Sequence, residues 1–269
     1  IGRVWRYEEI KAGRRYREFW QADADIVGVA GMDADAEVLA IAVFGLRKLG
    51  FKEFVIKLNN RKILEAICSR VGIKDDLFLA TCRAIDKIEK FGIRHVRQEL
   101  RSVGLNEKQI DELMNLTSFR GSNEDVIELL EKKIGKNKGI DELKELLEIC
   151  KIYKIDSCIK IDPSLSRGLD YYTGPIFEVV IKGKEKYGTV VAGGRYDKLI
   201  EIYGGPPTPA TGISFGVERL YQIMNDSGMF VVKNPTKLFI AAVKKEIKKN
   251  AIEIAQRFRE SGIPTEIDI

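Results

Sequence analysis

A long helical stretch interrupts the strand-rich parts of this chain and limits the folds that it can adopt. Between residues 75 and 154 apolar side chains recur at helical spacing, and Asn106 and Ser122 stand where they can cap two of the helices. Runs of β-branched and aromatic residues precede this stretch and follow it. The sequence therefore predicts an α+β domain that is interrupted by an all-helical insertion.

This organisation divides the chain into consecutive segments. We expect the first part of the main domain at 1–74, the insertion at 75–155, the second part at 156–230, a linker at 231–236 and the start of a parallel α/β domain at 237–269. Expected strands cover residues 4–7, 19–27, 54–58, 159–161, 176–182, 188–192, 238–243 and 265–269, and expected helices cover 33–49, 61–71, 214–224 and 247–261. The strands between 159 and 192 are typical of an antiparallel meander, and Asp33 or Asp35 is expected to cap the helix 33–49.

Composition excludes several kinds of function. The chain has 269 residues and one histidine, His95, so no metal site within it can use two histidines. His95 lies between charged residues and is expected on a helix surface. No apolar run reaches the roughly 18 residues of a membrane span, and no secretory signal is present. Four cysteines without a CxxC pair predict reduced thiols in a cytoplasmic protein.

The charge and the ends of the chain give two weaker indications. A net charge of +5 permits contact with nucleic acid without requiring it. Both ends have a strand-like pattern, and the first residue is Ile1 rather than Met. We therefore expect this chain to be a fragment of a longer protein.

The first chemically unusual cluster runs from Arg6 to Asp25. A basic loop leads into a strand on which Phe19, Gln21 and Asp25 share one face with Asp23, because alternate side chains of a strand point the same way. Carboxylates and an amide are poor core material. A ligand-binding face is favoured over a merely solvated one, since large aromatic residues alternate with the charges.

Two further clusters lie in the second half of the chain. Residues 167–174, Arg-Gly-Leu-Asp-Tyr-Tyr-Thr-Gly, combine a guanidinium fork with paired tyrosines, which suits an amphipathic anionic ligand. A structural Arg–Asp pair with core tyrosines explains that cluster equally well. Residues 193–197, Gly-Gly-Arg-Tyr-Asp, and 212–220 are rich in small residues, which allow close approach of a ligand to the backbone. The sequence contains neither a phosphate-binding GxxxxGK[ST] loop nor a dinucleotide-binding GxGxxG motif.

Together these clusters resemble the class II aminoacyl-tRNA synthetases, and specifically the histidyl-tRNA synthetase family. The stretch 6–25 is similar to motif 2 of the class, and residues 215–220, Phe-Gly-Val-Glu-Arg-Leu, are similar to motif 3. Residues 167–174 and 193–197 resemble the two motifs peculiar to the histidine enzymes. The resemblance implies an α+β fold in which an antiparallel sheet is flanked by helices, and it covers essentially the whole chain.

The resemblance also implies a two-step reaction. ATP and histidine give histidyl-adenylate, and the histidyl group then passes to the 3′ end of tRNA(His), with Mg²⁺ accompanying the ATP phosphates and no metal ligand assigned in the chain. For ATP, it implies Arg6 at the α-phosphate, Arg15 (or Arg14) at the distal phosphates, Phe19 and Arg219 on the two faces of adenine, and Glu8 beside adenine or ribose.

The amino acid would be held by a second set of residues. The resemblance implies Gln21 at the α-amino group and Asp25, Tyr172 and Tyr196 at the imidazole, with Tyr171 and Gly194 completing the histidine-binding set. A carboxylate and a hydroxyl can satisfy both ring nitrogens of a neutral imidazole. Arg167 would neutralise the substrate carboxylate and the α-phosphate, so Arg167 and Arg6 are the expected catalytic residues.

The chain also departs from the family pattern. Motif 1, which forms the class II dimer interface, and a Thr-Pro-Glu-like element for the α-amino group would precede Ile1, and only the first unit of the anticodon-binding domain is present. We expect a homodimer for the full-length protein. We also expect the 269-residue chain alone to be inactive or severely impaired, which ATP–pyrophosphate exchange at the full-length rate would contradict.

The sequence is also compatible with other functions. A non-catalytic, histidyl-synthetase-like regulatory or tRNA-sensing module is the main alternative, although such a module is expected to have lost Arg167, Gln21 or Arg219, which are all present. A class II synthetase for another amino acid is disfavoured by the paired tyrosines. The insertion could serve only to stabilise the fold, or it could in addition contact the acceptor stem of tRNA. Its Lys and Arg residues are mixed with many Glu residues, so its charge does not distinguish these two functions.

Overall fold

A computed structural model describes residues 1–269 except 8–15, 168–170, 231–234 and 269. The chain forms two compact units, residues 1–223 and 224–269. The strands are β1 (Gly2–Trp5), β2 (Glu18–Val27), β3 (Phe54–Asn60), β4 (Ile159–Ile161), β5 (Pro175–Ile181), β6 (Val191–Arg195), β7 (Ala210–Gly216), β8 (Leu238–Ala241) and β9 (Thr265–Asp268). The helices are α1 (Met32–Lys48), α2 (Arg61–Val71), α3 (Asp75–Ile85), α4 (Ile88–Phe91), α5 (Ile93–Val103), α6 (Glu107–Thr117), α7 (Asn123–Ile134), α8 (Lys138–Ile152), α9 (Leu199–Ile202), α10 (Val217–Asp226) and α11 (Lys248–Glu260).

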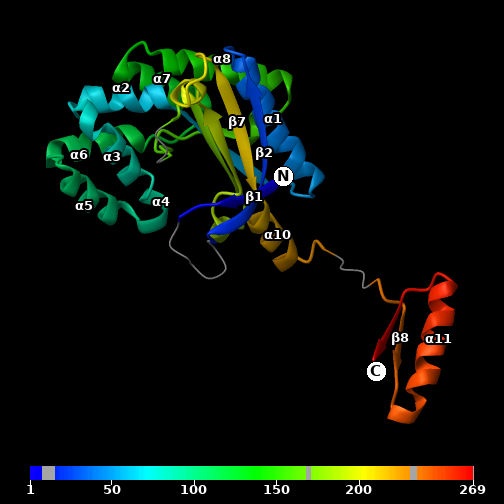
Figure 1. The fold of residues 1–269 in the computed structure, drawn as a ribbon. Helices are drawn as coiled ribbons and strands as arrows, with labels where there is room; N and C mark the ends of the chain where they lie inside the picture. The colour runs from blue at the N-terminus through cyan, green and yellow to red at the C-terminus, as the bar shows by residue number, and fades with distance from the viewer. Residues whose placement is uncertain (8–15, 168–170, 231–234, 269) are drawn as a thin grey trace. The chain divides into compact units, whose positions relative to one another are not determined.

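A seven-stranded sheet in the order β1-β2-β7-β6-β5-β3-β4 is the centre of the first unit. Helix α1 packs on β2, β6 and β7, and α8 packs on β3, β5 and α1, so these two helices cover one face of the sheet. Fully buried aliphatic and aromatic side chains fill the space between these layers, among them Leu39, Leu46, Ile56 and Phe177. Figure 1 shows α3–α6 gathered beside the sheet. The expected α+β fold with a helical stretch between two groups of strands is confirmed.

The sheet is not wholly antiparallel. Every strand pair of this seven-stranded sheet is antiparallel except β3–β4, in which Ile56 lies opposite Ile159 in a parallel pairing. The prediction of a meander from residue 159 onward is therefore wrong for β4, which pairs with β3 and not with β5. Helices α3–α8 lie between β3 and β4 in the chain, and such a long crossover permits a parallel arrangement.

Two expected element boundaries are also corrected. Residues 214–216 belong to β7 rather than to a helix, because Phe215 pairs with Ala22 on one side and with Val191 on the other; helix α10 begins only at Val217. Residues 188–190 are not part of β6, since Gly188 follows a 3₁₀ turn and has a φ of 72°. Strand β6 instead continues to Arg195.

Local signals in the sequence fix several helix ends. Asn106 and Ser122 each form a capping box, and Gly72 ends α2 with a left-handed φ of 72°. Helices α1, α3, α4, α5 and α11 begin without a side-chain cap. In α1 Gly31 precedes the first turn, and neither Asp33 nor Asp35 caps it. His95 lies partly exposed on α5 and is 3.0 Å from the Glu99 carboxylate.

The second unit consists of β8, α11 and β9. The two strands pair in parallel, with Leu238 opposite Thr265, and α11 connects them and packs on both. Ala251 and Ala255 are its buried residues. The expected strand–helix–strand unit is confirmed. None of the described helices in either unit is both long and apolar enough to cross a membrane.

Candidate active site

The candidate site lies on the sheet face that α1 and α8 leave uncovered. On β2, the side chains of Phe19, Gln21 and Asp25 alternate with the half-buried residues on the α1 side. Opposite them on β7 stand Gly216, Ser214 and Gly212, paired with Gln21, Asp23 and Asp25 respectively. Small residues at alternate positions of β7 therefore leave open space above the sheet. The buried Ser214 hydroxyl has no hydrogen-bond partner among the described residues.

Asp25 and Tyr196 form a hydrogen-bonded pair above Gly212. The Tyr196 hydroxyl donates to Oδ1 of Asp25. A Cβ atom on Gly212 would lie 1.8 Å from that oxygen and 3.0 Å from the Tyr196 hydroxyl, so only glycine fits there. Burial, and next the Asp25 carboxylate, raise the pKa of Tyr196 above its ordinary value, which keeps the hydroxyl protonated. The pair therefore places a carboxylate acceptor and a hydroxyl donor next to each other at a solvent-exposed position of the site.

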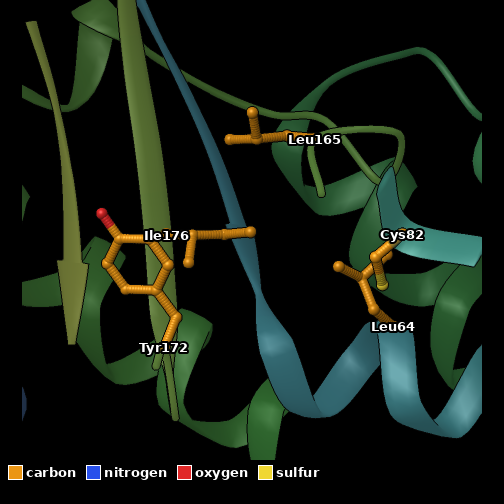
Figure 2. Packing of buried hydrophobic residues seen from close by; sticks show 5 residues of the cluster. All are labelled: Leu64, Cys82, Leu165, Tyr172 and Ile176. Atoms are coloured by element: carbon orange, nitrogen blue, oxygen red, sulfur yellow. The ribbon is translucent and has the colours of Figure 1, made fainter. Parts of the chain in front are cut away.

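Two further tyrosines, Tyr171 and Tyr172, lie beside this pair. The rings of Tyr171 and Tyr172 are 4.7 Å apart, and Tyr171 meets Tyr196 edge-on at 6.1 Å. Tyr172 is buried, and Figure 2 shows its ring beside Ile176 in an apolar cluster. Burial raises the pKa of the Tyr172 hydroxyl.

Glycine is required at positions 193 and 194 by contacts within the protein, whereas the sequence analysis attributed it to close approach of a ligand. A Cβ on Gly194 would lie 2.6 Å from the Pro175 carbonyl and 2.8 Å from the Tyr172 ring, and one on Gly193 would lie 2.1 Å from the Gly212 carbonyl. The chain itself therefore fills the space that a ligand was expected to approach. Gly194 supports the Tyr172 ring, and a direct contact of Gly194 with histidine stays a prediction.

Arg167 is held in an unusual position. Its φ of 42° lies in the left-handed region, which is rare for residues other than glycine and is found most often at functional sites. Its guanidinium lies 5.5 Å from the centre of the Tyr172 ring, and Nη1 is 3.7 Å from Oε1 of Glu178. Nη1 is buried and has no hydrogen-bond partner among the described residues. Glu178 is thus within ion-pair distance of this nitrogen but too far for a hydrogen bond.

Sequence reasoning missed the residues that connect Arg167 with Arg219. The Thr189 hydroxyl donates to Oε2 of Glu178 at 2.7 Å, and Arg219 donates through Nη1 to the Thr189 carbonyl. Glu178 therefore contacts Arg167 on one side and Thr189 on the other. A single acidic residue within the apolar strand β5 was the available signal.

The expected ATP-binding residues are only partly described. The Arg6 guanidinium lies 5.4 Å from the centre of the Phe19 ring and makes a cation–π contact with it. The sequence analysis expected adenine to stack on this ring, with Arg219 on the other face of the adenine. Gln21 is half-buried on the same strand. Glu8, Arg14 and Arg15 lie outside the described residues. Among the residues that the structure does describe, no cluster of three acidic, cysteine or histidine side chains could hold a metal ion.

Arg195 and Asp35 form a buried ion pair beneath the site. Asp35 is completely buried, and Arg195 donates to it through Nε at 3.0 Å and through Nη2. Thr211 donates to the other Asp35 oxygen at 2.9 Å, and Arg195 also reaches the Gly31 carbonyl at 2.9 Å. Burial raises the pKa of Asp35, and the hydrogen bond from Arg195 opposes that shift. The pair joins α1 to the last residue of β6, which directly precedes Tyr196.

Replacing Arg195 by methionine is expected to lower the free energy of unfolding by about 3–5 kcal/mol, because Asp35 would stay buried without its counter-ion. Urea denaturation measures this loss. The matched control is Arg101→Met, since Arg101 and Glu107 form an exposed pair whose removal is expected to leave the midpoint nearly unchanged. Equal destabilisation by both variants would contradict the role of the pair.

Comparisons with known proteins agree with the sequence motifs. The family model described as histidyl-tRNA synthetase matches residues 1–220. Proteins named histidine–tRNA ligase from Pyrococcus furiosus and Korarchaeum cryptofilum are 36% and 39% identical to the whole chain, which spans 62% of each of them. A histidyl-tRNA synthetase structure from Nostoc sp. PCC 7120 matches all of the chain and 64% of its own, with a TM-score of 0.77 and 26% identity. A Bacillus halodurans structure, titled as an ATP phosphoribosyltransferase regulatory subunit/histidyl-tRNA synthetase, matches 99% of the chain and 66% of its own, with a TM-score of 0.70 and 25% identity.

Proposed function

The chain belongs to the histidyl-tRNA synthetase family, and we propose that the protein containing it is a histidine–tRNA ligase. In this proposal the enzyme activates histidine with ATP and transfers the histidyl group to the 3′ end of tRNA(His). The observation that carries the proposal is the Asp25–Tyr196 pair above Gly212, which faces the same side of the sheet as Gln21. The family as a whole uses ATP, and the ATP-binding roles below are part of the proposal.

The pair suits recognition of imidazole. A neutral imidazole has one N–H donor and one nitrogen acceptor. The Asp25 carboxylate can accept from the N–H, and the protonated Tyr196 hydroxyl can donate to the other nitrogen once the ring enters. An apolar ring of the same size could bond to neither group, so it would gain nothing to offset separation of the Asp25–Tyr196 pair, and that difference provides specificity. Gln21, four residues before Asp25 on β2, would accept from the α-amino group.

Activation would depend on positioned positive charge. An oxygen of the histidine carboxylate attacks the α-phosphorus of ATP, and the bond between that phosphorus and pyrophosphate breaks. Arg167 would donate from Nη1, which has no hydrogen-bond partner among the described residues, to the carboxylate and the α-phosphate, where negative charge accumulates. Arg6 would contact the α-phosphate from β1's end of the site, and Phe19 with Arg219 would enclose the adenine.

Mg²⁺ is compatible with the described residues only as a partner of ATP. Mg²⁺ commonly binds through substrate phosphates with one or two carboxylates. Glu178, half-buried and 3.7 Å from Arg167, is the described carboxylate next to the proposed phosphate position. When bound, the ion would neutralise phosphate charge. Arg15 (or Arg14) would contact the distal phosphates, and Glu8 the adenine or ribose.

Other parts of the proposal concern the whole protein. We propose that residues 75–155 form a functional insertion within a catalytic domain at 1–74 and 156–230, followed by a linker at 231–236 and an anticodon-binding unit at 237–269. Homodimer formation and action in the cytoplasm are included as family expectations; unpaired cysteines are compatible with the latter.

Exchange of labelled pyrophosphate into ATP by the full-length protein tests the activation step. We expect exchange that requires histidine and is not supported by the other amino acids. Aminoacylation of tRNA(His) tests the transfer step. A protein that binds histidine or tRNA without any exchange would instead be a regulatory or tRNA-sensing module and would contradict the proposed ligase.

A further inference from the structure

The chain segment that leads into Arg167 is held by the helical insertion at successive points. This segment, residues 159–166, contains β4 and the loop after it. We propose that the insertion positions Arg167 for histidine activation and that Arg120 is the positioning residue on the insertion side. The inference rests on the proposed function, because it assigns the effect to the activation step.

The first contact is made by Asn123, the first residue of α7. Its side-chain nitrogen donates to the Ile159 carbonyl at 3.1 Å, and its side-chain oxygen accepts from the Ile161 backbone N–H at 2.8 Å. Strand β4 is at the edge of the sheet, where backbone groups lack a neighbouring strand. The Asn123 amide therefore replaces part of a missing strand and ties β4 to the insertion.

Arg120 makes the second contact. Through Nη2 it donates to the Ser164 hydroxyl at 3.1 Å and lies 3.3 Å from Oδ1 of Asp162. Through Nη1 it donates to the carbonyls of Thr117 and Phe119 at 3.2 Å and 2.7 Å, at the end of α6. One guanidinium thus joins the C-terminal end of an insertion helix to the loop before Arg167.

The third contact is adjacent to Arg167 itself. The Ser166 hydroxyl donates to the Cys82 carbonyl on α3 at 2.8 Å, and both residues are buried. Leu165 and Cys82 belong to the same apolar cluster as Tyr172, which Figure 2 shows between the insertion and the sheet. The insertion therefore contacts the chain up to the residue that precedes the strained Arg167 backbone.

Arg120 is the insertion side chain that contacts both Asp162 and Ser164, while the buried Asn59 of β3 donates to the Pro163 and Leu165 carbonyls at 3.2 Å and 2.8 Å. A cavity of about 260 Å³ borders Arg120 and Ser164 and is also lined by Ile88, Ile93 and Met114. Once the bonds of Arg120 are removed, we expect the part of the loop around Ser164 to shift toward this open space, while Asn59 still holds Pro163 and Leu165. Such a shift would move the Arg167 guanidinium relative to Glu178 and to the substrate.

Pyrophosphate exchange by full-length variants tests the inference. For Arg120→Ala we expect kcat to fall about tenfold at unchanged KM for ATP, since displacement of a catalytic group lowers the rate without removing a substrate contact. Arg101→Ala is the matched control and should retain the wild-type rate. Among the described residues, the side-chain hydrogen bonds of Arg101 are made to Glu107, which also lies in the insertion. Adding Arg120→Ala to Arg167→Ala should cause no further loss, because Arg120 acts through Arg167.

The outcomes separate three cases. A tenfold loss for Arg120→Ala that disappears in the Arg167→Ala background supports the inference. A wild-type rate for Arg120→Ala, or a loss that multiplies with that of Arg167→Ala, overturns it while the ligase assignment stands. Absence of histidine-dependent exchange in the wild-type protein overturns the proposed function itself, and the inference with it. Thermal unfolding of each variant shows whether a lower exchange rate results from loss of the folded protein. If Arg120→Ala is unfolded, Arg120→Lys is measured in its place.

Discussion

Replacing Arg167 by alanine in the full-length protein is expected to lower kcat for histidine-dependent pyrophosphate exchange by about 10³-fold. Arg167 carries a buried Nη1 that has no hydrogen-bond partner among the described residues and lies 3.7 Å from Glu178, so it retains a donor that a ligand oxygen could accept from. Removing one such donor from a preorganised site typically costs about 10²–10³-fold in rate. Arg167→Lys should recover only part of the loss, because an ammonium lacks the planar fork.

Two controls make this prediction specific. Arg101→Ala removes an exposed guanidinium from the same unit and should retain the wild-type rate. Glu178→Gln keeps the size of the residue beside Arg167 but removes its charge, and a smaller loss of rate is expected than for Arg167→Ala. Unchanged exchange in Arg167→Ala would show that the left-handed backbone and the unpaired nitrogen have no part in activation.

Much of the fold follows from signals that are local in the sequence. Asn106, Ser122 and Gly72 cap helices where their residue types predict it. Asp35 shows where such signals fail. An acidic residue near a helix start is a reasonable cap, yet Asp35 is buried against Arg195, which is 160 residues away. A partner so distant in the chain cannot be identified from a local pattern.

Strand β7 shows a second limit. Residues 214–216 have a pattern compatible with the start of a helix, but β2 and β6 pair with them on both sides and extend the strand. Tertiary pairing thus overrides local preference. The parallel pairing of β3 with β4 is likewise set by the intervening helices and not by either strand alone.

The site was predictable where a residue type itself carries the chemistry. Asp25, Tyr196 and Arg167 stand out because charged or amphipathic side chains interrupt strand patterns, and the structure brings the first two into contact. Whether these residues bind histidine stays a prediction. Glu178, Thr189 and Arg120 could not be found this way, since they contact other protein side chains and their role depends on those neighbours.

Replacing Asp25 by alanine is expected to lower kcat/KM for histidine in pyrophosphate exchange by about 10³-fold. The variant removes the acceptor for the imidazole N–H and leaves the Tyr196 hydroxyl without the carboxylate that it contacts. The KM for ATP should stay close to wild type, because Asp25 is at the opposite end of β2 from Phe19. Asp33→Ala, an exposed carboxylate on α1, is the matched control.

A substrate analogue distinguishes loss of recognition from general damage. Thienylalanine has a five-membered ring without an N–H donor, so the wild-type site should reject it strongly. In Asp25→Ala the ratio of kcat/KM for histidine to that for thienylalanine should fall, since histidine loses the acceptor of its ring N–H while thienylalanine has no such bond to lose. A variant that loses activity with both substrates in equal proportion would place imidazole recognition elsewhere, and the Asp25–Tyr196 pair would then be a structural contact between β2 and the chain that follows β6.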